Sequence, residues 1–317
     1  MDIKRPIRNL LSSVAGKLLQ RKPSAESMGG ADLCTPSPAP LPAGWSEEEL
    51  RELVTTILVE GGPSEELTNY ARIDFKRFIQ TLALVPDTPG LTLLELGANP
   101  YFTTTLLYKF RNVKLHLANF FGGPERQGVQ RVTVRKTGEV ILYTYKCFNI
   151  EHDQFPYEDG SFDILLFCEI LEHLLSDPVH ALLEIRRVLR DGGLLVLSTP
   201  NVARLGNVGK LIAGQNIYDP YSGYGPYGRH NREYTRDELF RLLSANGFQV
   251  KTLFTADVRN DLSHPPIALD VIRPLVECRG SDLGEFIFCQ SIVNQNAKWL
   301  PPVRPEWLYR SLHSKCP

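Results

Sequence analysis

A short segment near the middle of the chain carries acidic and histidine side chains at spacings that suit proton transfer. Glu172 and His173 follow Glu169 by three and four residues, so on a helical turn the three share a face. His173, and His230 further along, are candidate general bases that could take a proton from a hydroxyl group. Glu172 could accept a proton itself or orient a neighbour. A histidine that only caps a buried turn has the same sequence, so both roles stay open for His173.

A second candidate is the stretch YDPYSGYGPYGRHNREYT (218–235), which combines tyrosine with glycine, proline and arginine. Tyrosine rings offer flat apolar faces with a polar tip, which suits a sugar or an aromatic ligand. Arginine can bind a carboxylate or phosphate through two hydrogen bonds. The candidate ligand-binding residues are Tyr224, Tyr227, Arg229, Arg232 and Tyr234. The alternative is a loop that packs over the edge of the domain and binds nothing.

Alternating strands and helices must position these residues. Wholly apolar runs such as LTLLELG (91–97) and SFDILLFC (161–168) are typical of strands covered on both faces, as in a parallel sheet. Further strands are expected at 113–120, at 194–200, near 249–256 and 284–291, and in a hairpin around Thr137-Gly138. Helices are expected at 46–60, 64–84, 101–111, 178–190 and 236–246, the first and last opened by capping boxes at Ser46 and Thr235. This alternation predicts an α/β fold with a doubly wound sheet.

In such a sheet, ligands bind beyond the carboxyl ends of the strands. The first strand is followed by Glu95-Leu96-Gly97-Ala98-Asn99-Pro100-Tyr101. A glycine at this point lets the backbone approach a ligand closely, and the next helix offers unpaired N–H groups. A lone glycine is also common in an ordinary tight turn, so this loop alone is weak evidence.

The passage from Asn149 to Asn201 resembles the central part of class I S-adenosylmethionine-dependent methyltransferases. It contains a loop from Phe155 to Asp163 before a strand, then Glu-x-Leu-Glu-His, then a helix that ends in Leu-Arg-x-Gly-Gly. The resemblance covers roughly 90–256. It implies a Rossmann-like methyltransferase fold, with a mostly parallel seven-stranded sheet and helices on both faces. It also implies S-adenosylmethionine as the cofactor.

The resemblance implies a set of cofactor-binding residues: Glu95, Gly97, Asn99, Asn119, Asn149, Ile150, Cys168 and Glu169. Glu95 matches the acid that organises the methionine end, and Asn149 and Ile150 fall at the adenine-binding position. Two positions depart from the family. Asn99 and Tyr101 replace the second and third glycines of the first loop, which predicts a bulkier loop. Asn119 stands where the family has an acid for the ribose hydroxyls, and an amide binds a diol less strongly than a carboxylate.

The resemblance also implies an activity, most simply O-methylation of a small molecule or a saccharide. Stretches like 218–235 occur in methyltransferases of bacterial saccharide and secondary-metabolite pathways. His173, His230 and Glu172 are then the candidate catalytic residues. Glu169, Glu172 and His173 also resemble the group that some quinone-pathway O-methyltransferases place around a divalent metal, although many relatives carry these residues without one. The alternative is a protein that keeps the fold, has lost catalysis and acts by binding a partner.

Charge, missing motifs and cysteine spacing argue against several other classes of protein. The chain has 317 residues, a formal net charge of −1 and dispersed basic residues, which argues against a nucleic-acid partner. GxGxxG is missing after the first strand, which argues against a nicotinamide-dependent dehydrogenase. The six cysteines are far apart without a CxxC pair, which suits a reducing compartment, so a cytoplasmic location is expected.

Three regions are expected. Residues 1–45 form a basic amphipathic helix and a disordered Pro/Ala/Gly/Ser-rich linker, 46–296 the methyltransferase domain with N-terminal helices, and 297–317 a C-terminal tail. No apolar run is long enough to span a membrane. The first 22 residues could make weak contact with a membrane surface or simply form a loosely attached helix.

Overall fold

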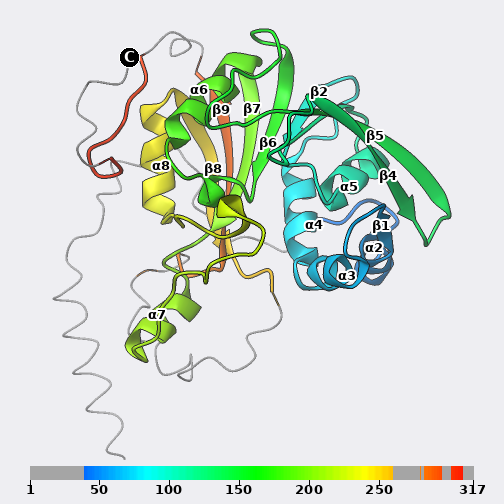
Figure 1. The fold of residues 1–317 in the computed structure, drawn as a ribbon, viewed down its shortest axis with the longest axis horizontal. Helices are drawn as coiled ribbons and strands as arrows, with labels where there is room; N and C mark the ends of the chain where they lie inside the picture. Colours follow the sequence, from blue (N-terminus) through cyan, green and yellow to red (C-terminus); the bar gives the residue numbers. More distant parts are fainter. Residues whose placement is uncertain (1–38, 260–278, 280–281, 295–300, 310–317) are drawn as a thin grey trace, which may run out of the picture.

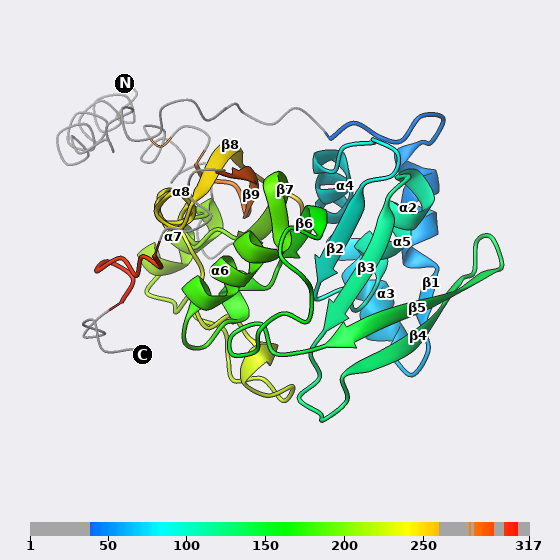
Figure 2. The same ribbon diagram turned by 90° about the horizontal axis from the view of Figure 1, so that it is seen from above.

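The structure is a computed structural model that describes residues 39–259, 279, 282–294 and 301–309. A nine-stranded sheet has the order β1-β4-β5-β3-β2-β6-β7-β9-β8 (Figures 1 and 2). The strands are β1 (Ile57–Val59), β2 (Thr92–Leu96), β3 (Lys114–Asn119), β4 (Gln127–Val134), β5 (Glu139–Cys147), β6 (Phe162–Cys168), β7 (Leu189–Pro200), β8 (Phe248–Ala256) and β9 (Phe286–Val293). The helices are α2 (Glu47–Thr55), α3 (Ser64–Ile73), α4 (Phe75–Leu84), α5 (Phe102–Phe110), α6 (Pro178–Val188), α7 (Leu205–Ile212) and α8 (Arg236–Ala245), with 3-10 turns η2 (Leu171–His173) and η3 (Pro226–Gly228).

The centre of the sheet is parallel: β2 pairs in parallel with β3 and β6, β3 with β5, and β6 with β7. The chain leaves β2 toward β3 and β5, then returns to place β6 on the other side of β2. The switch point therefore lies between β2 and β6, where an open α/β sheet binds its ligand. The predicted doubly wound α/β sheet with a mostly parallel centre is confirmed.

Successive residues of the central strands point into two separate cores, which explains their unbroken apolar runs. Leu93 packs with α2, α4 and α5, whereas Leu94 packs with α6 and α8. In β6, Leu166 and Leu165 divide in the same way. Helices thus cover both faces of the sheet (Figures 1 and 2).

Seven strands were predicted, but the sheet has nine. The two additional strands, β1 and β4, lie at one edge of the sheet. Residues 57–59 were expected to continue a helix, but they form β1, which pairs antiparallel with β4. The helix ends at Thr55 because the β-branched run that follows finds a strand partner in the hairpin. The hairpin itself is confirmed, with Gly138 at φ +70° in its turn. Its second arm, β5, is also the parallel neighbour of β3.

Other element boundaries differ in smaller ways. The expected helix 64–84 is divided at Asp74 into α3 and α4. The capping boxes at Ser46 and Thr235 are both present. Helix α7 was not expected from the sequence. Within the described residues, none of the helices is long and apolar enough to cross a lipid bilayer.

The ends of the chain are described only in part. The expected helix of residues 1–22 lies outside the described residues, but Trp45 packs edge-on against Phe110 with ring centroids 5.2 Å apart. In the tail, Tyr309 donates a hydrogen bond to Asp177 (2.5 Å), and Val303 exchanges two hydrogen bonds with the Asn246 side chain. Residues 301–309 therefore lie against the domain. Among the described cysteines, Cys147, Cys168 and Cys289 are free thiols.

Candidate active site

The loop after β2 turns at Gly97, which has φ +64°. A Cβ at this position would lie 2.9 Å from Cδ1 of Ile170, so the Ile170 side chain would have to shift to admit a side chain here. Tyr101 begins α5 with φ +68°, a conformation in which glycine is usual. Its ring is fully buried and stacks on Tyr143 with centroids 5.4 Å apart. The bulkier loop predicted from the sequence thus places the Tyr101 ring in the core.

A cleft runs over this loop at the carboxyl ends of β2, β3, β5 and β6. It consists of two adjoining hollows that share Leu96, Gly97, Asn99 and Glu169 in their walls. The larger hollow holds about 780 Å³ of empty space and the smaller about 490 Å³, including the parts open to solvent. All eight residues predicted to bind the cofactor lie in the walls of one hollow or the other: Glu95, Gly97, Asn99, Asn119, Asn149, Ile150, Cys168 and Glu169.

The smaller hollow is charged. Glu95, at the end of β2, is buried and accepts a hydrogen bond from Thr104 (2.6 Å). Burial raises the pKa of Glu95 to about 8, and the bond from Thr104 opposes only part of this shift. Glu169 has φ +56° and accepts a hydrogen bond from Ser198 (2.8 Å). Burial also raises the pKa of Glu169, while the positive charge of Arg77 works against the shift.

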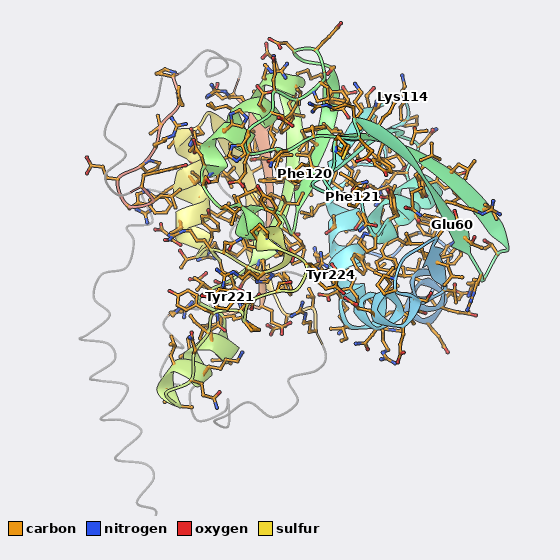
Figure 3. The ribbon with its side chains drawn as sticks, viewed as in Figure 1. Glu60, Lys114, Phe120, Phe121, Tyr221 and Tyr224 are labelled. Carbon is orange, nitrogen blue, oxygen red and sulfur yellow. The ribbon has the colours of Figure 1, made fainter. Side chains whose placement is uncertain are left out.

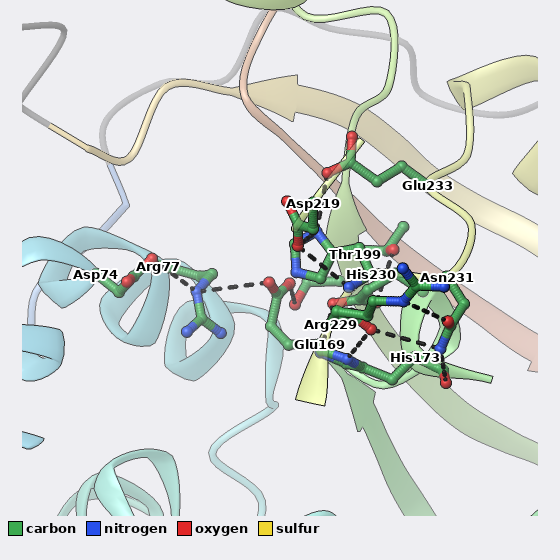
Figure 4. Close-up of polar contacts among 12 residues, drawn as sticks. Asp74, Arg77, Glu169, His173, Thr199, Asp219, Arg229, His230, Asn231 and Glu233 are labelled. Carbon is green, nitrogen blue, oxygen red and sulfur yellow. Dashed lines mark hydrogen bonds and ion pairs between the residues drawn. The ribbon is translucent and has the colours of Figure 1, made fainter. Parts of the chain in front are cut away.

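Arg77 of α4 is the main residue that sequence reasoning missed. Its side chain is 4% exposed, and its Nε lies 3.4 Å from Asp74 and 3.9 Å from Glu169 (Figure 4). It also donates a hydrogen bond to the hydroxyl group of Tyr70. A basic residue within the largely apolar run FKRFIQTLAL was the available signal. That run precedes β2, and only tertiary packing brings it to the loop that follows this strand.

Asn119 holds the loop as well as lining the cleft. Its Oδ1 accepts a hydrogen bond from the backbone N–H of Asn99 (2.9 Å), and its Nδ2 donates to the Tyr101 hydroxyl (2.9 Å). A primary amide can donate two hydrogen bonds and accept two. One N–H and one oxygen lone pair therefore remain for a ligand.

The larger hollow becomes apolar away from Gly97. Phe148, Ile150 and Leu174 line it, together with Phe120 and Tyr227, whose rings meet edge-on with centroids 5.9 Å apart. Asn149 donates a hydrogen bond to the Tyr227 hydroxyl (3.2 Å). Glu151, two residues beyond Asn149, has a structural role: its Oε1 accepts hydrogen bonds from the backbone N–H groups of Leu175, Ser176 and Asp177, so it fixes the turn before α6.

Glu172, His173 and His230 come together beside the cleft, and each offers one ligand atom within 4.8 Å of the others. His173 lines the larger hollow, and its ring meets that of His230 with centroids 5.0 Å apart. Glu172 is fully buried and accepts a hydrogen bond from Thr199 (2.9 Å). The three predicted catalytic residues are therefore neighbours.

Burial dominates the electrostatics of this group. It raises the pKa of Glu172 to about 8, with a further contribution from the charge of Glu169. Burial and the neighbouring His230 lower the pKa of His173. Burial also tends to lower the pKa of His230. The hydrogen bond with Glu233 and the negative charge of Glu172 have a larger, opposite effect, so the pKa of His230 is raised.

The structure does not group Glu169 with Glu172 and His173 as the sequence suggested. The three were expected to share one face of a helical turn. Instead, Glu169 precedes the turn η2 in a left-handed conformation, and its carboxylate lies between Ser198 and Arg77. His230, from a loop 57 residues beyond His173, takes the place that Glu169 was expected to fill.

The tyrosine-rich stretch divides between cleft, surface and core. Tyr227 lines the cleft. Tyr224 is 76% exposed and donates a hydrogen bond to Glu66 of α3 (2.9 Å), while Arg229 stacks on the exposed ring of Tyr221 (Figure 3). Two candidates are not among the residues that line the two hollows: Tyr234 is 2% exposed within the core, and Arg232 pairs with Glu238 of α8 (2.8 Å).

Comparison with known proteins gives a matching family. The family model of a methyltransferase domain matches residues 124–197. An uncharacterised 37.1 kDa protein in transposon TN4556 of Streptomyces fradiae is 50% identical over 113 residues, 36% of this chain and 31% of that protein. A ubiquinone biosynthesis O-methyltransferase of Roseobacter denitrificans is 31% identical over 38% of this chain and 45% of that protein. A probable S-adenosylmethionine-dependent methyltransferase of Mycolicibacterium smegmatis is 30% identical over 34% of this chain and 37% of that protein. The chain thus spans less than half the length of each of these relatives.

Proposed function

We propose that this chain, which belongs to the class I S-adenosylmethionine-dependent methyltransferases, binds S-adenosylmethionine in the cleft beside Gly97 and transfers its methyl group to a hydroxyl group of a small molecule or saccharide. The observation that carries the proposal is the change in chemistry along the cleft. One end has a buried guanidinium group and two buried carboxyl groups, the middle has two amides, and the other end is apolar. This order suits a molecule with an amino-acid end, a diol and a purine.

Each part of the cofactor then has partners of fitting chemistry. The carboxyl oxygens of Glu95 and Glu169 can accept hydrogen bonds from an ammonium group, whose positive charge would favour loss of their protons, and the guanidinium of Arg77 suits a carboxylate. Asn99 and Asn119 retain hydrogen-bonding capacity for ribose hydroxyls. Phe148, Ile150 and Leu174 suit an adenine ring, with Asn149 as a polar neighbour. Cys168 borders the charged end, where its thiol lies 3.7 Å from the carbonyl oxygen of Val196.

When bound, S-adenosylmethionine supplies a methyl group on a positively charged sulfur. The protein's main contribution to such a displacement is alignment of the acceptor atom, which can be worth about 7–11 kcal/mol. We propose that Glu172, His173 and His230 hold the acceptor hydroxyl and promote loss of its proton. They lie beside the cleft near Glu169, which borders both hollows.

The choice of a hydroxyl acceptor rests on two observations. Tyr227 lines the cleft, and Tyr218, Tyr221 and Tyr224 expose 76–91% of their surface on the same loop, where flat faces could stack on sugar rings. Arg229, stacked on Tyr221, adds a positive charge for an acidic substituent. In addition, one relative carries the name of an O-methyltransferase.

The test is transfer of radiolabelled methyl groups from S-adenosylmethionine to a panel of acceptors: neutral and acidic saccharides, phenols, amines and thiols. We expect label in compounds with free hydroxyl groups and a mass increase of one methyl group in the product. Tyr227→Ala should raise the KM for the acceptor, whereas Tyr218→Ala, on the exposed part of the loop, should change it less. Label that enters amines or thiols alone would refute the hydroxyl assignment, and no transfer to any acceptor would refute the activity.

A further inference from the structure

The hydrogen bonds of His173 and His230 fix which ring nitrogen of each is free. Nδ1 of His173 lies 2.9 Å from the carbonyl oxygen of Arg229, which can only accept, so Nδ1 carries the proton. Nδ1 of His230 lies 2.9 Å from Oε1 of Glu233, which as a carboxylate also accepts. In both neutral rings Nε2 therefore keeps a free lone pair. Histidines that bind metals usually donate their other ring N–H to a carbonyl or carboxylate in this way.

Glu172 supplies the third donor atom. Its Oε2 accepts the hydrogen bond from Thr199, but its Oε1 is buried without a hydrogen-bond partner among the described residues. Leaving such an atom unsatisfied is costly. Oε1 lies 3.8 Å from Nε2 of His173. A tetrahedral cation with bonds of about 2.1 Å holds its ligand atoms about 3.4 Å apart, so small side-chain rotations would bring these two atoms to a shared ion.

The backbone holds the two donor segments together. Both Asn231 and Arg232 donate backbone N–H bonds to the carbonyl oxygen of Glu172 (2.7 and 3.1 Å), and the Asn231 side chain donates to the carbonyl oxygen of His173 (2.9 Å). With the bond from His173 to Arg229, four hydrogen bonds join the turn η2 to the loop that carries His230 (Figure 4). The three donors are thus arranged by the protein itself.

We propose that Glu172, His173 and His230 bind one divalent transition-metal cation, with an open coordination position toward the cleft. Two imidazoles and one carboxylate favour Zn²⁺, Co²⁺, Fe²⁺ or Mn²⁺ over Mg²⁺ and Ca²⁺, which prefer oxygen ligands. Three protein ligands leave room for a water molecule or a substrate oxygen, as at catalytic zinc sites. His173 lines the larger hollow, so that open position is within reach of an acceptor.

The role of the cation rests on the proposed function. An acceptor hydroxyl bound to the cation loses its proton to solvent more readily, because the positive charge stabilises the alkoxide or phenolate oxygen. That oxygen then forms the new bond to the methyl carbon. The carbon–sulfur bond breaks, and its electron pair stays on sulfur, which becomes neutral. Charge and atoms balance without a further reactant.

The test is metal binding to the full chain after treatment with a chelator. Zn²⁺ is titrated calorimetrically, and Co²⁺ is followed by its visible absorption, which reports imidazole ligation and coordination geometry. We expect one equivalent per chain, and about 100-fold or more weaker binding in His173→Ala and His230→Ala. The matched control is His152→Ala, at an exposed histidine outside the group, which should bind as the unmodified chain does. Mg²⁺ should bind far more weakly than Zn²⁺.

Two further measurements distinguish a loss of metal binding from a loss of folding and from a loss of cofactor binding. Glu172→Gln retains the shape of the side chain but loses its charge, and a circular dichroism melt shows whether it folds. If it does not fold, His230→Asn, in a loop, serves instead. S-adenosylmethionine binding is measured on the same samples. Equal Zn²⁺ affinity in His230→Ala and the unmodified chain would overturn the metal site, as would a stoichiometry near zero. Retained cofactor binding in either case would leave the proposed function standing.

Discussion

At the scale of single residues, Gly97 and its neighbours determine whether the cleft can hold a nucleoside. Gly97 combines a positive φ with close approach of the Ile170 side chain, which would have to shift to admit a Cβ. Arg77 supplies a positive charge and Glu95 a buried carboxyl group at the end of the cleft proposed for the amino-acid part of the cofactor. Three predictions follow from these positions.

Gly97→Ala should weaken S-adenosylmethionine binding by about tenfold or more, because the new Cβ strains the left-handed backbone of the loop and displaces the Ile170 side chain, which lines the cleft. Gly90→Ala is the matched control: Gly90 also has a positive φ, +83°, but nothing lies within 4 Å of its added Cβ. Both variants should lose about 1 kcal/mol or more of unfolding free energy from backbone strain. Equal cofactor affinity in the two, measured by calorimetry, would show that the loop does not contact the ligand.

Arg77→Lys keeps the positive charge but loses the planar geometry that pairs with a carboxylate. We expect S-adenosylmethionine affinity to fall about tenfold, and affinity for adenosine, which has no amino-acid part, to stay unchanged. Arg111→Lys is the control, since Arg111 bonds the carbonyl oxygens at the end of α4, away from the cleft. A parallel loss for both ligands in Arg77→Lys would mean that Arg77 only maintains the fold.

Glu95 should make stability depend on pH. Its pKa is about 8 in the folded chain, above the ordinary value of 4.5 that applies on unfolding. The folded state therefore holds the proton more tightly, and this stabilisation is present below pH 4.5 and is lost as the pH rises through 8. The loss approaches about 1.4 kcal/mol per pH unit in the middle of that window.

Urea denaturation at pH 5, 6.5 and 8 should show this slope in the unmodified chain and a flatter one in Glu95→Gln. Glu48→Gln, an exposed substitution, controls for the change of residue type. Equal slopes in the unmodified chain and Glu95→Gln would contradict the raised pKa.

At the scale of elements, the decisive junction is between the turn η2 and the loop around His230. Asn231 joins the two segments. Its side chain donates hydrogen bonds to the carbonyl oxygens of His173 and Pro226, and its backbone N–H donates to the carbonyl oxygen of Glu172. Asn231→Ala should lower kcat for methyl transfer about tenfold or more while cofactor affinity stays within twofold, because the cofactor residues lie on other elements. Asn216→Ala, in the exposed part of the same loop, is the control. An unchanged kcat in Asn231→Ala would separate this junction from the chemistry.

The elements also show what local sequence could predict. The apolar runs predicted the central strands, and the capping box at Thr235 predicted the start of α8. Both signals are local, because they depend on residues only a few positions apart. The group of Glu172, His173 and His230 required contact between segments 57 residues apart. Arg77 was missed for the same reason, because α4 reaches the cleft only through tertiary packing. Tyr234 shares its local composition with Tyr227, yet one is core and the other lines the cleft. The turn at Gly97 was predicted, whereas the left-handed Glu169 was not.

At the scale of the whole molecule, the parallel centre of the sheet brings the carboxyl ends of β2, β3, β5 and β6 to one edge, and the helices α3 and α4 close the charged end. Ligand binding here should stabilise the entire domain, since only the folded chain assembles the cleft. At a ligand concentration 100 times its Kd, the unfolding free energy should rise by about 2.7 kcal/mol. The central claim is that this cleft is the cofactor site.

The most direct test is a calorimetric titration of the full chain with S-adenosylhomocysteine, the product left after methyl transfer, together with a thermal melt at saturation. The account predicts one binding site per chain, a higher Tm, and a clear loss of affinity in both Gly97→Ala and Arg77→Lys. Absence of heat and of any Tm shift at millimolar ligand would contradict it, as would binding that neither substitution weakens.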